Sequence, residues 1–350
     1  MTNLCRTPPH LFRLATRALC AGLLLIATTN AAIEQTPAEF LKGRNVNLLI
    51  GFGVGGDDDL WGRLIARHMG RHLPGQPTVV PQNVAGGAGL LVANRLYNVA
   101  PRDGTVIGMI NRGIPFEPLL GGQGAQFDAL KLNWIGSPNR DTTVCAARKD
   151  AAVETMQDLF RRELTVGATG SGADTATYPE LLSAVVGMKF KVVRGYQGSH
   201  EIQLAMERNE VQGVCLAYDS LARGTLFRAN QLNVLLEAAL DPDPRLHDVP
   251  SGIDFAHSDK ERETLELFFA RAMLGRPLVA PPQVPVDRVL ALQRAFDETL
   301  RDPAFLADAE AGKLRVDPSS GQRLLQIISK AYQASALSVE QTMQAMGRAK

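Results

Sequence analysis

A regular alternation of short apolar runs and longer amphipathic segments constrains this chain more than any other feature. Residues 45–50 and 106–110 are apolar runs typical of buried strands, and a shorter run lies at 78–80. Between them, residues 60–73 and 90–99 have apolar side chains at helical spacing, and glycines and prolines separate the segments. Strand–helix–strand repeats of this kind predict a parallel sheet with right-handed crossovers, so we expect an α/β fold.

A second α/β unit follows a loop rich in glycine and proline at residues 114–140. Its expected elements are the strands 142–147, 164–168, 189–194, 211–217 and 231–238 and the helices 155–162, 177–186 and 201–208. From residue 260 onward the pattern is helical, and a length of 350 residues fits two domains. We therefore expect two lobes, each a central sheet flanked by helices: lobe 1 from residues 33–138 plus 237–350, and lobe 2 from residues 139–236.

The first segment, residues 1–31, is expected to be a secretory signal peptide with cleavage near Ala31. This segment contains three arginines and no acid, and a short apolar run follows them at 18–27. The run is much shorter than the roughly 20 residues that are needed to span a bilayer. Its removal takes three of the 37 Lys and Arg residues and none of the 36 Asp and Glu residues, so the formal charge changes from +1 to −2. A near-neutral chain without a basic stripe argues against a nucleic-acid partner.

Two cysteines, Cys145 and Cys215, remain once the leader is removed. Both lie in runs that read as strands, and an exported protein meets an oxidising environment in which cysteines pair. The sequence does not decide between a Cys145–Cys215 disulfide and two buried free thiols.

The segment GFGVGG at residues 51–56 satisfies the G-x-G-x-x-G pattern of dinucleotide-binding turns, because it follows a strand and opens a helix. Two observations oppose a dinucleotide. The acid that would hold the ribose is absent at residues 80–83, which read VPQN, and Asp57, Asp58 and Asp59 would repel a pyrophosphate at the helix N-terminus. A dinucleotide-dependent oxidoreductase therefore stays only as a minor alternative.

Similar glycine turns recur at residues 85–89, 167–172 and 195–199, each before an expected helix. Such turns leave backbone N–H groups free at helix N-termini, where anions bind. Turns at the carboxyl ends of strands in both lobes would converge on one crevice. Together they predict a site for a small anionic ligand held by backbone amides.

At these turns the chain resembles the exported receptors of the tripartite tricarboxylate transporter system, the Bug-type solute-binding proteins. The resemblance covers nearly the whole chain after the leader, although Ala85, Gly87 and Ala88 depart from the family's pattern. The matching residues are Phe52, Gly55, Gly56, Asp59 and Arg63, the segments 83–89 and 100–105, and Gly170, Gly172, Tyr196, Gly198 and Ser199.

The resemblance implies a two-lobe, type II-like periplasmic binding protein with its ligand cleft between the lobes. It implies a small carboxylate ligand, held by backbone amides and waters and delivered to the membrane permease subunits of a tripartite transporter. We expect a monomer in the periplasm, with no catalysis, cofactor, metal or nucleic-acid partner. The expected ligand-binding residues are Val54, Gly55, Gly56, Asp59, Gly86, Gly87, Ala88, Asn111, Arg112, Thr169, Gly170, Ser171, Gly172, Ala173, Tyr196, Gly198 and Asp219.

Charged residues near the expected cleft bear on the ligand class. Asp57 and Asp58 would disfavour a dianion, and we expect them to point outward to solvent because consecutive residues in a turn diverge. If they faced inward, they would favour an amine-bearing or neutral ligand or a cation. Arg112, just after a strand, is either a bidentate partner of a ligand carboxylate or a surface arginine. Asp59 is expected to cap the helix that follows it.

An exported α/β enzyme is the main alternative from another class. A hydrolase is disfavoured because Thr169 precedes a Gly-Ser-Gly segment that lacks the G-x-S-x-G pattern, and no base is assembled with a nucleophile, although His200 and Asp174 lie near glycine turns. His68 and His72 have the i, i+4 spacing of zinc ligands but no third ligand. We expect these two histidines on a solvated flank of a helix.

Overall fold

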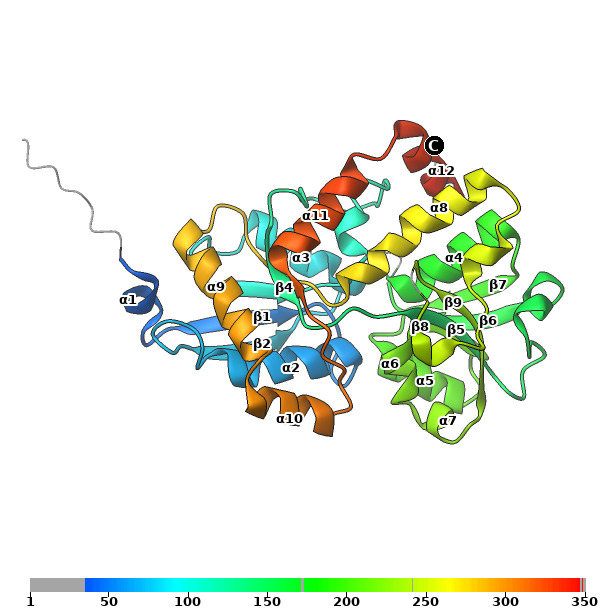
Figure 1. The fold of residues 1–350 in the computed structure, drawn as a ribbon, viewed down its shortest axis with the longest axis horizontal. Helices are drawn as coiled ribbons and strands as arrows, with labels where there is room; N and C mark the ends of the chain where they lie inside the picture. Colours follow the sequence, from blue (N-terminus) through cyan, green and yellow to red (C-terminus); the bar gives the residue numbers. More distant parts are fainter. Residues whose placement is uncertain (1–34, 171–172, 241, 347, 349–350) are drawn as a thin grey trace, which may run out of the picture. The chain divides into compact units, whose positions relative to one another are not determined.

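The structure is a computed structural model that describes residues 35–170, 173–240, 242–346 and 348 (Figure 1). The expected signal peptide lies outside the described residues. Pro37–Lys350 form one compact unit, which contains both sheets. Within the described ranges, no helix combines the length and the hydropathy that crossing a membrane requires.

The first sheet contains the predicted parallel strands. β1 (Asn45–Ile50) pairs in parallel with β2 (Thr78–Asn83) on one side and with β3 (Val106–Met109) on the other. α2 (Asp57–Met69) and α3 (Leu90–Asn98) connect these strands, as the alternation predicted. Because parallel strands end at the same edge of a sheet, the turns after β1 and β3 lie next to each other there.

The same sheet continues with antiparallel strands that the sequence pattern missed. β4 (Asn133–Ser137), β10 (Leu278–Ala280) and β11 (Ser319–Ser320) extend it in the order β11-β4-β10-β3-β1-β2. The expectations of a loop over residues 114–140 and of only helices after residue 260 are therefore wrong at these strands. A run as short as β10, directly followed by prolines, carries no periodicity, and only its pairing with β3 and β4 makes it a strand.

The second sheet contains the strands predicted for the second lobe, with ends shifted by at most two residues. They are β5 (Thr143–Arg148), β6 (Leu164–Ala168), β7 (Phe190–Arg194), β8 (Gly213–Ala217) and β9 (Leu232–Ala238). Their order is β7-β6-β8-β5-β9. The sheet is mixed, because β6 runs parallel to β7 and β8 whereas β5 runs antiparallel to β8 and β9.

Short helices follow the strands of the second sheet. They are α4 (Asp174–Val186), α5 (Ser199–Glu207), α6 (Tyr218–Ala222) and α7 (Thr225–Arg228). The helix predicted at 155–162 is instead a single 3₁₀ segment, Met156–Phe160, with a capping box formed by Thr155 and Asp158. α4 begins three residues before its predicted start, which brings its N-terminus to the preceding glycine turn.

The C-terminal helices pack on both lobes. On the first sheet, α9 (Val286–Thr299) and α11 (Gly321–Tyr332) contact β4, and α10 (Pro303–Ala311) contacts α2. The short N-terminal helix α1 (Pro37–Leu41) contacts α9. On the second lobe, α8 (Asp259–Phe269) and α12 (Ala336–Ala345) contact α4. Figure 1 shows α8 and α12 above α4, next to the second sheet. The domain boundaries expected from the sequence remain a prediction.

A disulfide joins Cys145 on β5 to Cys215 on β8. The two residues lie opposite each other in the antiparallel pair, with 4.0 Å between their Cα atoms, and both are fully buried. The register of β5 against β8 therefore places the two thiols together, which the separate strand patterns could not establish.

Candidate functional site

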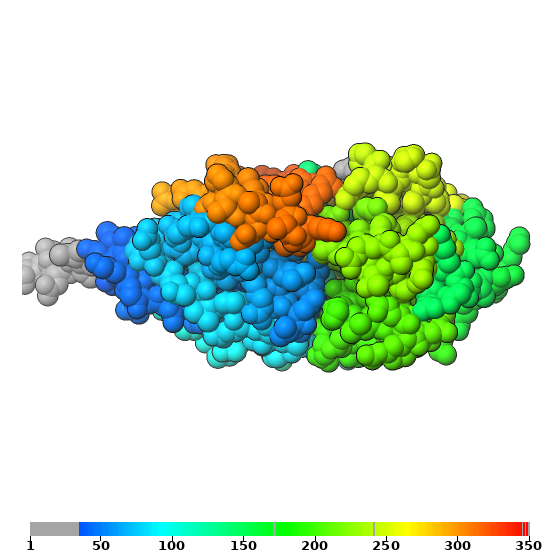
Figure 2. Space-filling model, turned by 90° about the horizontal axis from the view of Figure 1, so that it is seen from below, coloured from blue at the N-terminus to red at the C-terminus, as the bar shows by residue number. Residues whose placement is uncertain are grey.

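Strand ends and helix N-termini from both lobes surround a pocket, which we call the inter-lobe pocket. It contains about 600 Å³ of empty space, part of it open to solvent. Its lining residues are Phe52, Gly56, Asp57, Asp58, Asn111 and Arg112 after β1 and β3, Thr169, Ala173, Asp174, Thr175, Gly198, Ser199, Leu216, Ala217 and Ser220 in the second lobe, and Gly275 and Arg276 before β10. Figure 2 shows the surface of the blue N-terminal part directly against the green surface of the second lobe.

Three helix N-termini border this pocket. The N-cap residues of α2, α4 and α5 are Gly56, Ala173 and Gly198, and none of them makes a side-chain cap hydrogen bond. The first N–H groups of a helix have no partner within it, and the helix dipole adds a partial positive charge at this end. The arrangement therefore favours a bound anion.

Asp59 holds the turn before α2 in place. The helix begins at Asp57, so Asp59 lies within its first turn, where Oδ2 accepts a hydrogen bond from Gly55 N at 2.9 Å. Its Oδ1 accepts from Arg63 Nε at 2.9 Å and from Asn83 Nδ2 at 2.8 Å. Although burial acts to raise it, these donors hold the pKa of Asp59 below its usual value. Asp59 is therefore not the N-cap that the sequence predicted: it lies inside the first turn of α2 and holds the backbone before the helix.

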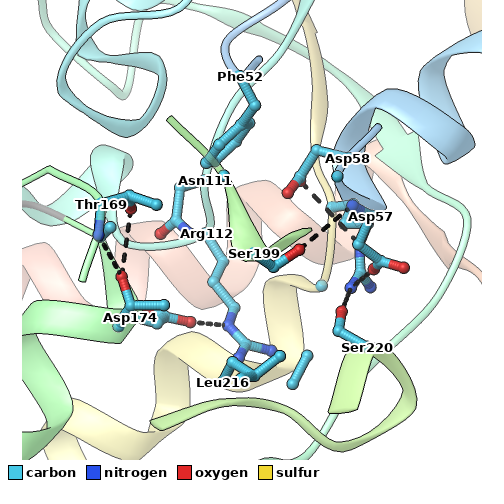
Figure 3. A pocket seen from close by; sticks show the side chains of 17 residues that line it. Phe52, Asp57, Asp58, Asn111, Arg112, Thr169, Asp174, Ser199, Leu216 and Ser220 are labelled. Atoms are coloured by element: carbon cyan, nitrogen blue, oxygen red, sulfur yellow. Dashed lines mark hydrogen bonds and ion pairs between the residues drawn. The ribbon is translucent and has the colours of Figure 1, made fainter. Parts of the chain in front are cut away.

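Asp57 and Asp58 face the inter-lobe pocket, so the expectation that they point outward is wrong (Figure 3). Asp57 is 5% exposed and forms ion pairs with Arg276 and with Arg223 of the second lobe. Asp58 Oδ1 lies 4.0 Å from Nε of the same Arg276. Turn geometry alone did not decide the orientation, because the arginines and the helix N-terminus compensate the buried negative charge.

Arg276 connects several walls of the pocket, and nothing in the sequence singled it out. In addition to its ion pair with Asp57, Nη1 lies 2.8 Å from Asp141 Oδ2. Gly275 precedes it with a φ of +57°, and a Cβ there would overlap the carbonyl oxygen of Asn139. Only glycine fits this backbone conformation and this close approach, so Gly275 sets the position of the Arg276 side chain.

A second ion-pair group lies on the other side of the pocket. Arg112 after β3 binds Asp174 at the start of α4, and Asp174 Oδ1 also accepts from Arg271 Nη2 at 2.8 Å. Other donors of Arg112 reach Asp141 O at 3.3 Å and Thr143 Oγ1 at 2.5 Å. Although burial acts to raise it, the two arginines hold the pKa of Asp174 below its usual value. Arg112 is therefore not a surface arginine, and its contact with a ligand carboxylate stays a prediction.

Burial has the opposite result at Asp58, whose pKa it raises from an ordinary 3.8 to about 7. Arg112 acts to lower this pKa, but burial outweighs it, and Asp174 and Asp59 add to the rise through their negative charge. The Asp58 carboxyl therefore titrates near neutral pH.

Replacing Asp58 with asparagine should remove part of the pH dependence of stability. The folded-state pKa lies above the unfolded value, so the contribution of Asp58 is fully present below about pH 4 and is lost as the pH rises to about 7. The wild-type protein should therefore lose stability relative to D58N between about pH 5 and about pH 7.5. Urea denaturation of both proteins at the two pH values measures this change. If the free energies of unfolding of the two proteins differ by the same amount at both pH values, the prediction is contradicted.

The structure brings part of the predicted ligand-binding set to the inter-lobe pocket. Those that line it are Gly56, Asn111, Arg112, Thr169, Ala173 and Gly198. The described residues of the set that do not line it are Val54, Gly55, Asp59, Gly86, Gly87, Ala88, Gly170, Tyr196 and Asp219. Ser171 and Gly172 lie outside the described residues. Contact of any of these residues with a ligand stays a prediction.

Several of the non-lining residues have other contacts. Asp219 forms an ion pair with Arg245, at 2.5 Å. Gly170 meets the backbone of Gly87 and Ala88 across the boundary between the lobes, where a Cβ on Gly170 would lie 2.9 Å from the carbonyl carbon of Gly87. These turns therefore meet each other beside the pocket.

Other lining residues were not predicted. Ser199 is the last residue of a predicted glycine turn and was left out of the expected set, and Asp174 follows another such turn closely, so extending that turn into the next helix would have found it. Ser220 and Arg276 were missed because both reach the pocket through the packing of segments that are distant in the sequence.

His68 in α2 and His72, which follows the end of this helix, do not lie on a solvated flank as expected. His68 is 4% exposed, and its Nε2 lies 2.9 Å from Asp308 Oδ2 on α10. His72 Nε2 lies 2.8 Å from Asp302 Oδ2. α10 covers this face of α2, which the local spacing could not reveal. The described part of the chain contains no cluster of three or more His, Cys, Asp or Glu side chains arranged for a metal.

Comparison with known proteins agrees with the fold. A family model described as "Tripartite tricarboxylate transporter family receptor" matches residues 62–342. A UPF0065 protein of Bordetella pertussis is 24% identical over 298 residues, which cover 83% of this chain and 85% of that protein.

Two solved structures share the architecture. The periplasmic binding protein BugD, 18% identical, has a TM-score of 0.68 and covers 87% of this chain and 98% of its own. MatC (Rpa3494) from Rhodopseudomonas palustris with bound malate, 17% identical, has a TM-score of 0.67 and covers 87% of this chain and 99% of its own. The fold is thus the two-lobe, type II-like fold of periplasmic binding proteins.

Proposed function

Because the chain belongs to the tripartite tricarboxylate transporter receptor family, we propose that it captures a small carboxylate-containing solute in the inter-lobe pocket. The convergence on this pocket of three helix N-termini whose N-cap residues make no side-chain cap hydrogen bond carries the proposal. Their dipoles, and first-turn N–H groups that have no partner within the helix, stabilise an anion in a place removed from bulk water. The malate bound to MatC, a protein of the same fold, supports a carboxylate ligand.

The proposed role is that of an exported receptor, a periplasmic monomer that delivers its solute to the membrane subunits of a tripartite transporter. The family description supports this role. The basic and apolar leader in the sequence supports export.

An exported enzyme has less support than a receptor. The family is one of receptors, and the hydroxyl groups in the pocket have partners other than a general base. Ser199 Oγ accepts from Asp57 N at 3.4 Å, and Ser220 Oγ accepts from Arg276 Nη2 at 3.2 Å. We propose binding without catalysis.

A thermal-shift screen of di- and tricarboxylates, aromatic acids and amino acids tests the function. A ligand at about 100 times its Kd stabilises the folded protein by about 2.7 kcal/mol, so its Tm should rise by several degrees. The stabilising compound should be recovered unchanged after incubation. Its turnover would overturn the receptor function.

Replacing Gly170 with alanine should weaken ligand binding about 10-fold or more, because a Cβ at this position would lie 2.9 Å from the Gly87 carbonyl carbon and 3.0 Å from Ala88 N. The clash opposes the arrangement in which the lobes are in contact. Isothermal titration of the best ligand from the screen measures the loss.

Gly312→Ala is the matched control, since a Cβ there meets its neighbours at ordinary distances of 3.4 Å or more, and Gly312 does not line the pocket. It should leave the affinity unchanged. Equal affinities of G170A and the wild-type protein would show that this contact plays no part in binding.

A further inference from the structure

A second hollow, which we call the outer hollow, adjoins the inter-lobe pocket. It contains about 730 Å³ of empty space, part of it open to solvent. Gly55, Asp57 and Leu60 of the first lobe line it, together with residues of α5, α6 and α7 in the second lobe. Asp57, Ser199 and Ser220 line both spaces, so they form the wall between them, and Figure 3 shows them on the same side of the inter-lobe pocket.

The ion pair between Asp57 and Arg223 crosses from one lobe to the other at this wall. Asp57 begins α2, which connects strands of the first sheet, whereas Arg223 follows α6, after β8 of the second sheet. Nη1 of Arg223 also donates to the backbone oxygen of Lys313, just beyond α10, at 3.2 Å. Because α10 packs on α2, both contacts of Arg223 attach the second lobe to the same part of the first.

The Asp57–Arg223 pair is largely shielded from water. The side chains of Arg223 and Asp57 are 16% and 4% exposed. Burial lowers the pKa of Arg223 to about 10, so the guanidinium is still charged at neutral pH. Hydrogen bonds between charged groups are about twice as strong as those between neutral ones, and solvent screens a shielded pair less than an exposed one.

Two neutral hydrogen bonds join the lobes next to this pair. Gly53 N donates to Gln197 O at 3.3 Å, and Asp57 N donates to Ser199 Oγ at 3.4 Å. Both distances exceed the usual range for an N–H···O bond, so each bond is weak. The charged contact of Arg223 is therefore the stronger attachment at this place.

We propose that Arg223 is a latch residue, whose ion pair with Asp57 holds the two lobes together at the wall between the outer hollow and the inter-lobe pocket. Both partners belong to the protein, so this part of the free energy of closure does not depend on a solute. In a receptor of the proposed function, the latch slows the opening through which a solute leaves. That consequence rests on the proposed function, whereas the latch itself does not.

Hydrogen exchange of single amides, followed by NMR in the wild-type protein and in R223A without added solute, tests the latch. The amides of Gly53 and Asp57 donate to the other lobe, so they exchange when the lobes separate. We expect both to exchange about 10-fold or more faster in R223A. Gly51 N donates to Met109 O at 3.0 Å inside the first sheet, and its exchange rate should not change. A general loss of stability would accelerate this reference amide as well.

R228A is the matched control. Arg228 is exposed on α7 and lines the same outer hollow from the second lobe. Its replacement should leave the exchange rates of Gly53 and Asp57 unchanged. R223Q, which keeps a long polar side chain but removes the charge, should act like R223A and replaces it if the alanine variant does not fold. Thermal unfolding confirms that each variant is folded.

A double variant tests whether Arg223 acts through Asp57. In D57A the ion pair is already absent, so the further change R223A should accelerate exchange at Gly53 much less than it does in the wild-type protein. Equal acceleration in both backgrounds would overturn the proposal. Unchanged exchange of Gly53 and Asp57 in folded R223A or R223Q would also overturn it. None of these results involves a solute, so the thermal-shift screen tests the proposed function separately.

Discussion

Replacing Asp174 with alanine should lower the free energy of unfolding by about 3–5 kcal/mol, because it leaves two buried arginines without their counter-ion. Arg112 and Arg271, which are 4% and 1% exposed, both bind the Asp174 carboxylate. Because the pKa of Asp174 is lowered in the folded protein, its contribution is present above the unfolded pKa and is lost as the pH falls through the folded value. Urea denaturation near neutral pH therefore measures the full effect.

Asp150→Ala is the control for this experiment. Asp150 also pairs with an arginine, Arg148, at 2.5 Å, but its side chain is 63% exposed. Water solvates the Asp150 carboxylate at such a site, and Arg148 keeps the backbone carbonyl of Met206 as a partner, so the loss of the pair should change stability little. A decrease for D174A as small as that for D150A would contradict the view that Asp174 neutralises buried charge.

Removing the disulfide by replacing Cys145 and Cys215 with alanine should lower the free energy of unfolding by about 4 kcal/mol. The bond closes a loop between residues 70 apart in the sequence, and it restricts the unfolded chain in proportion to the logarithm of that length. Both cysteines are fully buried on adjacent paired strands, so the strand pairing holds these two positions together in the folded protein even without the bond. Urea denaturation of the oxidised wild-type protein and the double variant measures the difference.

A reducing agent provides the internal check. It should lower the unfolding midpoint of the wild-type protein and leave that of the double variant where it was. Equal stability of the oxidised and reduced wild-type protein would show that the bond does not restrict the unfolded chain.

Much of the fold could be predicted from local patterns. β1 and β6 were placed to the residue, because short, mostly apolar runs between turns leave a clear signature. β10 and β11 were missed because such short strands exist only through pairing with β3 and β4. α2 was predicted, but its start was placed too late because Asp59 resembled an N-cap.

The sequence by itself determined where glycine turns end the strands, and hence that helix N-termini would border a pocket between two lobes. Gly56, Ala173 and Gly198 follow from that pattern. The tertiary structure alone decided the charge of the pocket. Asp57 and Asp58 turn inward because Arg276 and Arg223, far away in the sequence, lie beside them, and the electrostatic energy of a buried carboxylate depends on distance in space rather than along the chain.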